Sequence, residues 1–221
     1  MASTYTERTE KSVLRAETTG SLVEVAGGVA IIVLSIIGLA RIGNVGALPA
    51  ISVIILGAAL IAEGGTIATE FSRLIGMTVG AAGVGEFNGG MTTEILVGAV
   101  VLVLGVLSVL GVSPATLVPS AIIVAGALLL ISAANVQRMN SVKIATLGTT
   151  EGAQALLQSA ISAAAGFQVL AGIASVVLGI LALSSAANLA IFTMVGLLVL
   201  GAAVTMSGGT LTGSLMRMMN R

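Results

Sequence analysis

Acidic and amide side chains at the ends of long apolar runs are the residues of this sequence best suited to chemistry. Glu24, Glu94 and Gln168 each precede an apolar run, and Glu63 follows one. Ionisable groups in membrane segments are functional candidates, so Glu24, Glu63 and Glu94 form a candidate carboxylate cluster: a ring that binds protons or attracts cations. A structural interpretation stands beside it. Glutamate in a first helical turn is favoured by the helix dipole and by unpaired backbone donors. This accounts for Glu24 and Glu94 but not for Glu63, because Glu63 lies at the end of its helix.

The residue types that are missing exclude several classes of site. The sequence has no His, Cys or Trp, and all nine of its acidic residues are Glu. Zinc, haem and iron–sulfur sites rely mostly on imidazole or thiolate ligands, and serine–histidine or cysteine–histidine nucleophiles need a base that is absent. The nine basic and nine acidic residues cancel, so no overall field attracts nucleic acid. We therefore expect no enzyme, no catalytic residue, no cofactor, no metal and no nucleic-acid partner.

The composition predicts an all-α integral membrane protein. Apolar residues make up 57% of the 221 residues and charged residues only 8%, whereas a soluble domain carries about a quarter charged residues. Crossing about 30 Å of hydrocarbon takes roughly 20 apolar residues in a helix. Six runs approach that length, at residues 25–42, 48–62, 95–112, 117–134, 169–183 and 189–206. The polar first 24 residues lack the apolar core of a cleaved leader, so we expect no signal peptide.

Connection lengths and basic residues predict the topology. The connections at 43–47, 113–116 and 184–188 are short, whereas those at 63–93 and 135–168 are long, which favours three helical hairpins. Arg41 is the only basic residue beside a short turn, and we expect it to reach the lipid headgroups. The other eight lie in the long segments and termini: Arg8, Lys11, Arg15, Arg73, Arg138, Lys143, Arg217 and Arg221. By the positive-inside rule, both termini and both long segments are cytoplasmic, in the inner (plasma) membrane of the cell.

The hairpins repeat in sequence. Residues 24–28, 94–98 and 168–172 read EVAGG, EILVG and QVLAG, and residues 57–65, 126–134 and 201–209 read GAALIAEGG, GALLLISAA and GAAVTMSGG. Two marker glycines per hairpin are separated by 29, 28 and 29 positions (28 to 57, 98 to 126, 172 to 201). Direct repeats with an even number of spans are related by rotation about the membrane normal, unlike the inverted repeats of many transporters. We therefore expect a pseudo-threefold bundle of six transmembrane helices built from three direct helical-hairpin repeats.

These features divide the chain into seven segments. The hairpin repeats cover residues 24–66, 94–134 and 167–209. Between and around them we expect a polar cytoplasmic segment at 1–23, a glycine-rich cytoplasmic loop at 67–93, a cytoplasmic or interfacial loop at 135–166 with an amphipathic helix over 151–165, and a cytoplasmic tail at 210–221.

Small residues at four-residue spacing form a helix-packing stripe on each of the last two spans. The fifth span carries Ala171, Ser175 and Gly179, and the sixth carries Gly201, Thr205 and Gly209. Small residues let backbones approach closely in lipid, where helices associate by packing. The stripes pack helices within one subunit, or they pack one subunit against another. We expect the lipid bilayer as a partner, together with a homo-oligomer or a larger membrane complex in which the chain is an accessory subunit.

The hairpin pattern resembles the HdeD-like family of small bacterial inner-membrane proteins, which have six spans with short repeats. The stretch that carries the resemblance best is AGIASVVLGILAL at residues 171–183. The resemblance implies a stress-linked or acid-resistance membrane protein without a defined catalytic site.

Two classes of function remain at this point. The first is a structural or organising membrane protein that acts through helix packing and oligomerisation. The alternative is a small channel or transporter that uses the cytoplasmic-side Glu cluster as a cation or proton site. The midplane favours the first class, because its polar side chains are Ser35, Ser52, Ser175 and Thr193, each able to bond its own helix backbone.

Overall fold

The chain folds into a bundle of long helices. The structure, a computed structural model, describes residues 22–42, 45–78, 84–146 and 151–219, and side chains over 22–42, 46–65, 93–133, 163 and 165–207. In the described residues the elements are an N-terminal helix (Leu22–Leu39), the 3-10 turn η1 (Val45–Ala47), and helices α2 (Leu48–Thr78), α3 (Val84–Val109), α4 (Pro114–Thr146), α5 (Glu151–Ser184) and α6 (Leu189–Met219). Five helices are long and apolar enough to cross a membrane, and α3 contributes the shorter apolar stretch Thr93–Val109. The prediction of an all-helical protein is confirmed, and five of the six predicted spans correspond to helices long and apolar enough to cross a membrane.

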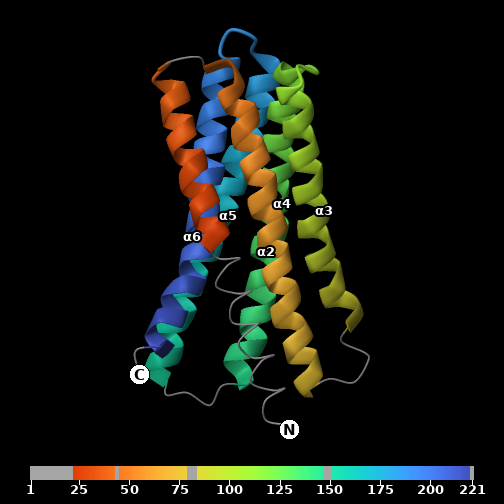
Figure 1. Cartoon of the computed structure of the whole chain (residues 1–221). Helices are drawn as coiled ribbons and strands as arrows, with labels where there is room; N and C mark the ends of the chain where they lie inside the picture. Colours follow the sequence, from red (N-terminus) through yellow and green to blue (C-terminus); the bar gives the residue numbers. More distant parts are fainter. Residues whose placement is uncertain (1–21, 43–44, 79–83, 147–150, 220–221) are drawn as a thin grey trace.

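Three tight connections join the helices at one end of the bundle (Figure 1). Two of them begin with a residue in the left-handed conformation, Arg41 with φ 54° and Gly111 with φ 85°. The amide after each of these residues bonds a carbonyl five positions back, Ile42 to Ile37 at 3.2 Å and Val112 to Leu107 at 3.0 Å. These bonds satisfy carbonyls that the end of a helix would leave unpaired. Pro114 then starts α4 at a helical position where its missing N–H costs nothing.

The long segments predicted as loops are mostly helical, which corrects the sequence-based boundaries. Within 67–93, α2 runs on to Thr78 and α3 begins at Val84, while residues 79–83 lie outside the described part of the chain. Within 135–166, α4 continues to Thr146 and the predicted amphipathic helix over 151–165 is the first part of α5. The tail from residue 210 belongs to α6 as far as Met219. A fall in hydropathy marks where a helix leaves the apolar layer, but the helix itself continues because each added residue gains a backbone hydrogen bond.

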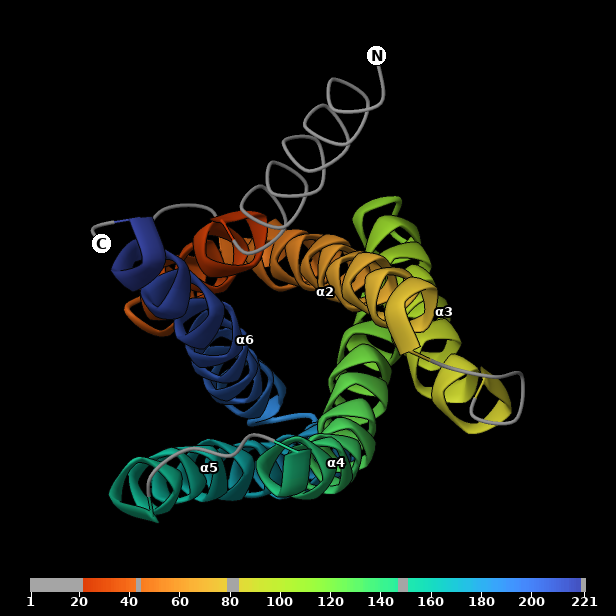
Figure 2. The ribbon, with the colours of Figure 1, turned by 90° about the horizontal axis from the view of Figure 1, so that it is seen from below.

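The even-numbered helices occupy the inside of the bundle. α2, α4 and α6 each pack against the other two, and viewed along the bundle the helices surround a common centre (Figure 2). The apolar windows of α2, α4 and α6 are 44, 50 and 44% buried, against 28% for the N-terminal helix and 28% for α5. We call α2, α4 and α6 the inner helices and the N-terminal helix, α3 and α5 the outer helices.

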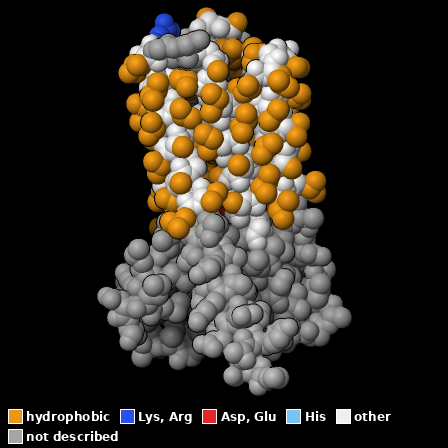
Figure 3. Space-filling model, in the orientation of Figure 1, with side chains coloured by type: hydrophobic (Ala, Val, Ile, Leu, Met, Phe, Trp, Pro, Cys, Tyr) orange, Lys and Arg blue, Asp and Glu red, His pale blue; other side chains and the backbone are white. Residues whose placement is uncertain are grey.

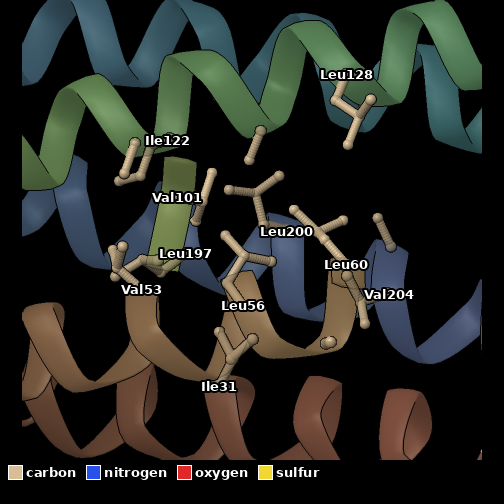
Figure 4. Packing of buried hydrophobic residues seen from close by; sticks show 14 of the residues in the cluster. Ile31, Val53, Leu56, Leu60, Val101, Ile122, Leu128, Leu197, Leu200 and Val204 are labelled. Carbon is tan, nitrogen blue, oxygen red and sulfur yellow. The ribbon is translucent and has the colours of Figure 1, made fainter. Parts of the chain in front are cut away.

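The core is apolar and comes mainly from the inner helices. Figure 4 shows Leu56, Ile122 and Leu200 among the side chains that meet there from α2, α4 and α6. The outer helices contribute Ile31 and Val101 to the same cluster, and both are fully buried. The middle of the bundle is therefore filled mainly by aliphatic side chains.

The outward surface of the described part is also apolar. Val33, Val103 and Val177, one on each outer helix, are 48, 53 and 48% exposed. Figure 3 shows hydrophobic side chains spread over the whole described face of the bundle. A continuous apolar surface of this kind is unfavourable in water and suits the hydrocarbon interior of a membrane.

Candidate functional site

The three glutamates of the predicted carboxylate cluster lie close together in the structure, at the level where the N-terminal helix begins, and α2 and α3 extend beyond them away from the tight turns. Glu24 is near the start of the N-terminal helix and 1% exposed, and Glu94 on α3 is 8% exposed. Glu63 on α2 is half-buried and lies within electrostatic range of both. A Cβ built on Gly64 would be 3.2 Å from the Cβ of Glu94, so α2 and α3 are in direct contact beside the two acids. Three helices thus bring their carboxyl groups to one place.

Two serines from the inner helices join the cluster through hydrogen bonds. The Ser132 hydroxyl donates to Glu94 Oε1 at 2.6 Å, and the Ser207 hydroxyl donates to Glu24 Oε1. Ser207 is also hydrogen-bonded to Glu63. Neither serine was predicted as a site residue, although the glycine spacing in the sequence carries a signal for both. Counting six residues from the second marker glycine of each hairpin (57, 126, 201) leads to Glu63, Ser132 and Ser207.

No basic side chain balances the cluster within the part of the chain whose side chains are described. Arg41 is the only Lys or Arg among those residues, and it is exposed at the opposite end of its helix. Glu94 Oε2 is buried and has no hydrogen-bond partner. The same residues hold no group of three His, Cys, Asp or Glu arranged to bind a metal ion. Among the described side chains, the cluster therefore consists of carboxyl and hydroxyl groups.

Gln168 occupies the position in the third repeat motif that Glu24 and Glu94 hold in the first two. It is half-buried on α5. An amide carries no charge. At this position of the motif, therefore, only the first two hairpins have an acidic residue.

The packing stripes lie at contacts between helices of the same chain. On α5, Ala171 is buried. The Cβ of Ser175 is 2.9 Å from the position that a Cβ on Gly126 of α4 would take. A Cβ on Gly179 would be 3.0 Å from Pro119 O, also on α4. On α6, a Cβ on Gly201 would be 3.0 Å from Gly28 O. Thr205 lies beside the same Gly28, and its hydroxyl donates to Gly201 O at 2.7 Å. Gly209 falls outside the residues whose side chains are described. The described stripe residues thus contact other helices of the same chain.

The marker glycines meet in three pairs, each joining an outer helix to an inner helix of another hairpin. A Cβ on Gly28 would lie 2.8 Å from Gly201 O, one on Gly98 would lie 3.1 Å from Gly57 O, and one on Gly172 would lie 2.9 Å from Gly126 O. Because real Cβ atoms do not approach a carbonyl oxygen so closely without displacement, a larger residue at these positions would push the backbones apart.

The polar side chains at mid-span behave in two ways. The Thr193 hydroxyl donates to Leu189 O at 2.6 Å, as a helical threonine can. Ser35, Ser52 and Ser175 are fully buried and have no hydrogen-bond partner, so they do not make the backbone bonds available to them. Counting three residues from the first marker glycine leads to Ile31, Val101 and Ser175, so Ser175 fills a core position that is aliphatic in the other two hairpins.

Comparisons with known proteins leave the geometry as the basis for inferring function. No family model, no curated protein and no solved structure matches this chain. Function is therefore inferred from the carboxyl cluster, the glycine pairs and the apolar centre.

Proposed function

We propose that the protein is a structural or organising multi-pass membrane protein, built as a pseudo-threefold bundle of three hairpin repeats and resembling the HdeD-like family. The observation that carries the proposal is the set of three glycine pairs, Gly28 with Gly201, Gly98 with Gly57, and Gly172 with Gly126. Each pair joins the first marker of one hairpin to the second marker of the preceding hairpin, counted cyclically. This equivalence is what rotation about a central axis would produce.

The packed centre supports a scaffold over a transporter. The inner helices meet through Leu56, Ile122 and Leu200, which belong to one apolar cluster. A conduction path needs polar groups or water across the membrane, and transporters that bind substrate at mid-depth use broken helices there. α2 and α6 run unbroken through this region, and α4 continues through its internal Pro119. A closed, close-packed bundle is suited to holding other membrane components in position.

Association would use the outward faces of the outer helices. The described stripe residues are engaged inside the chain, which leaves the exposed valines of the N-terminal helix, α3 and α5 to contact lipid, a second copy or a larger complex. The eight basic residues on the side of the termini support an orientation with both termini in the cytoplasm of a plasma membrane. The resemblance adds a role in stress or acid resistance.

The test of the scaffold is self-association in native membranes. Because the chain has no Cys, Val103→Cys on the exposed face of α3 places a single thiol on the proposed surface, and Val101→Cys, at a fully buried position, is the matched control. We expect oxidation to give cross-linked species with Val103→Cys and none with Val101→Cys. A monodisperse monomer in mild detergent, together with no cross-linked or copurifying species from membranes, contradicts the proposal.

A second candidate function is a proton or cation channel, and the carboxyl cluster is the observation that favours it. Flux into liposomes is compared for the wild type, Glu63→Gln and, as a control in the polar N-terminal segment, Glu10→Gln. A channel predicts flux in the wild type and in Glu10→Gln but not in Glu63→Gln. Undetectable flux in all three rejects the channel and leaves the scaffold.

A further inference from the structure

The hydrogen bonds of Ser207 require more protons than its hydroxyl can supply. Its oxygen is bonded to Glu24 Oε1, to the Glu63 carboxyl group and to Val204 O at 3.2 Å. A serine hydroxyl has one proton to donate, and an ionised carboxylate can only accept. With Glu24 and Glu63 both ionised, the three acceptors would compete for this one proton. A proton on one carboxyl group, donated to the Ser207 oxygen, ends the competition between the two carboxyl groups and leaves the other carboxylate and Val204 O to share the hydroxyl proton.

Glu94 provides a second and separate observation. Its Oε1 accepts the Ser132 hydroxyl, but its Oε2 is buried without a donor, and the residue is 8% exposed. A buried carboxylate oxygen that has lost its water without gaining a donor is costly, and the cost is much larger for a charged group than for a neutral one. A proton on Oε2 makes this group neutral.

The polar side chains described at the cluster are carboxyl and hydroxyl groups. The titratable groups there are Glu24 on the N-terminal helix, Glu63 on α2 and Glu94 on α3, while α4 and α6 contribute the uncharged Ser132 and Ser207. Along a helix that contributes to the cluster, the nearest basic residue is Arg138. It lies six residues beyond Ser132 and therefore about 9 Å further along α4, at 1.5 Å per residue. Three neighbouring carboxylates repel one another at low dielectric, and protonation of a carboxyl group relieves this repulsion.

We propose that Glu24, Glu63 and Glu94, with Ser132 and Ser207, form a binding site for protons that is occupied at neutral pH. One proton is shared across Glu24, Ser207 and Glu63, and another resides on Glu94 Oε2. The site deepens the carboxyl-cluster part of the proposed function, and it requires no flux, since a proton can be bound without being transported. The two serines orient the carboxyl groups and donate to whichever oxygens are unprotonated.

Infrared spectroscopy of the full chain in proteoliposomes tests the site. At neutral pH, where solvated glutamate is ionised, the wild type is expected to show a protonated-carboxyl C=O absorption that shifts in ²H₂O. Glu94→Gln is expected to remove the part of this absorption that comes from the proton on Glu94 Oε2. Glu63→Gln is expected to remove or shift the part that comes from the proton shared across Glu24, Ser207 and Glu63. Glu10→Gln, in the polar N-terminal segment, leaves the absorption unchanged.

The wild-type spectrum alone can overturn the proposal, so the test survives a variant that does not fold. Absence of a protonated-carboxyl absorption at neutral pH rejects the site. An absorption that is equal in the wild type and in folded Glu24→Gln, Glu63→Gln and Glu94→Gln rejects the assignment to these residues. Neither result depends on self-association or flux, so a failure here is distinct from a failure of the scaffold or channel function.

Discussion

Arg41, two residues after the N-terminal helix, has a left-handed conformation, and Gly111 has one at the same point of the second hairpin. Both residues follow the first marker glycine by thirteen positions (28 to 41 and 98 to 111), and their φ angles are 54° and 85°. The left-handed region costs a residue with a Cβ roughly 1–2 kcal/mol, a cost that glycine does not have. Arg41 is thus held in a strained conformation at the one place where a basic side chain lies beside a short turn.

Substitutions at this turn position should show the cost of a positive φ angle in both hairpins. Gly111→Ala is expected to lower the free energy of unfolding by about 1 kcal/mol, because alanine must adopt the positive φ. Arg41→Gly should be more stable than Arg41→Ala by a similar amount, since these two variants lose the same charge and differ in the backbone cost. Denaturant unfolding in detergent measures both differences. An Arg41→Gly protein less stable than Arg41→Ala would show that backbone strain at the positive φ does not control the stability of this turn.

The site residues were only partly predictable from their own positions in the sequence. Glu24, Glu63 and Glu94 stand out because an acid beside an apolar run is unusual. Ser132 and Ser207 do not, because a serine in a membrane helix usually bonds its own backbone. Only the packing of α4 against α3 and of α6 against the N-terminal helix turns these hydroxyls towards carboxyl groups.

At the scale of elements, close approach of backbones distinguishes the glycines from one another. On α2, a Cβ at Gly57 would lie 2.5 Å from the backbone nitrogen of Leu102, whereas a Cβ at Gly65 meets nothing within 4 Å. The two positions have the same residue in the same helix but different surroundings. The helix boundaries depend on a different property, since α2 continues to Thr78, well beyond its apolar run.

Gly57→Ala and Gly65→Ala should therefore change stability in opposite directions. We expect Gly57→Ala to destabilise by about 1–3 kcal/mol or more, because the added methyl group meets backbone that cannot rotate away. Gly65→Ala should stabilise by up to about 1 kcal/mol through helix propensity. Thermal unfolding in one detergent measures both variants. Equal effects would mean that α2 and α3 are not in close contact at Gly57.

At the scale of the whole molecule, the distribution of charge predicts orientation. Eight of the nine basic residues belong to the side of the termini and long segments, and the exposed turn at 186–188 belongs to the other side. The cysteine-free chain allows a direct measurement. Ser3→Cys should react with a membrane-impermeant maleimide only after cells are opened, whereas Ala187→Cys should react in intact spheroplasts. The reverse pattern would place the termini outside the cytoplasm.

The sequence by itself determined the helical class, the apolar spans and the tight turns, because span length, hydropathy and turn residues are local properties of the chain. Only the tertiary structure decided which helices lie inside, which glycines meet, and which hydroxyl reaches each carboxyl group. The physical reason is that these helices are apolar on every side, so no contrast between polar and apolar faces marks the inward one. In lipid, helices find their neighbours by the close fit of small residues, and that fit exists only between helices that are already side by side.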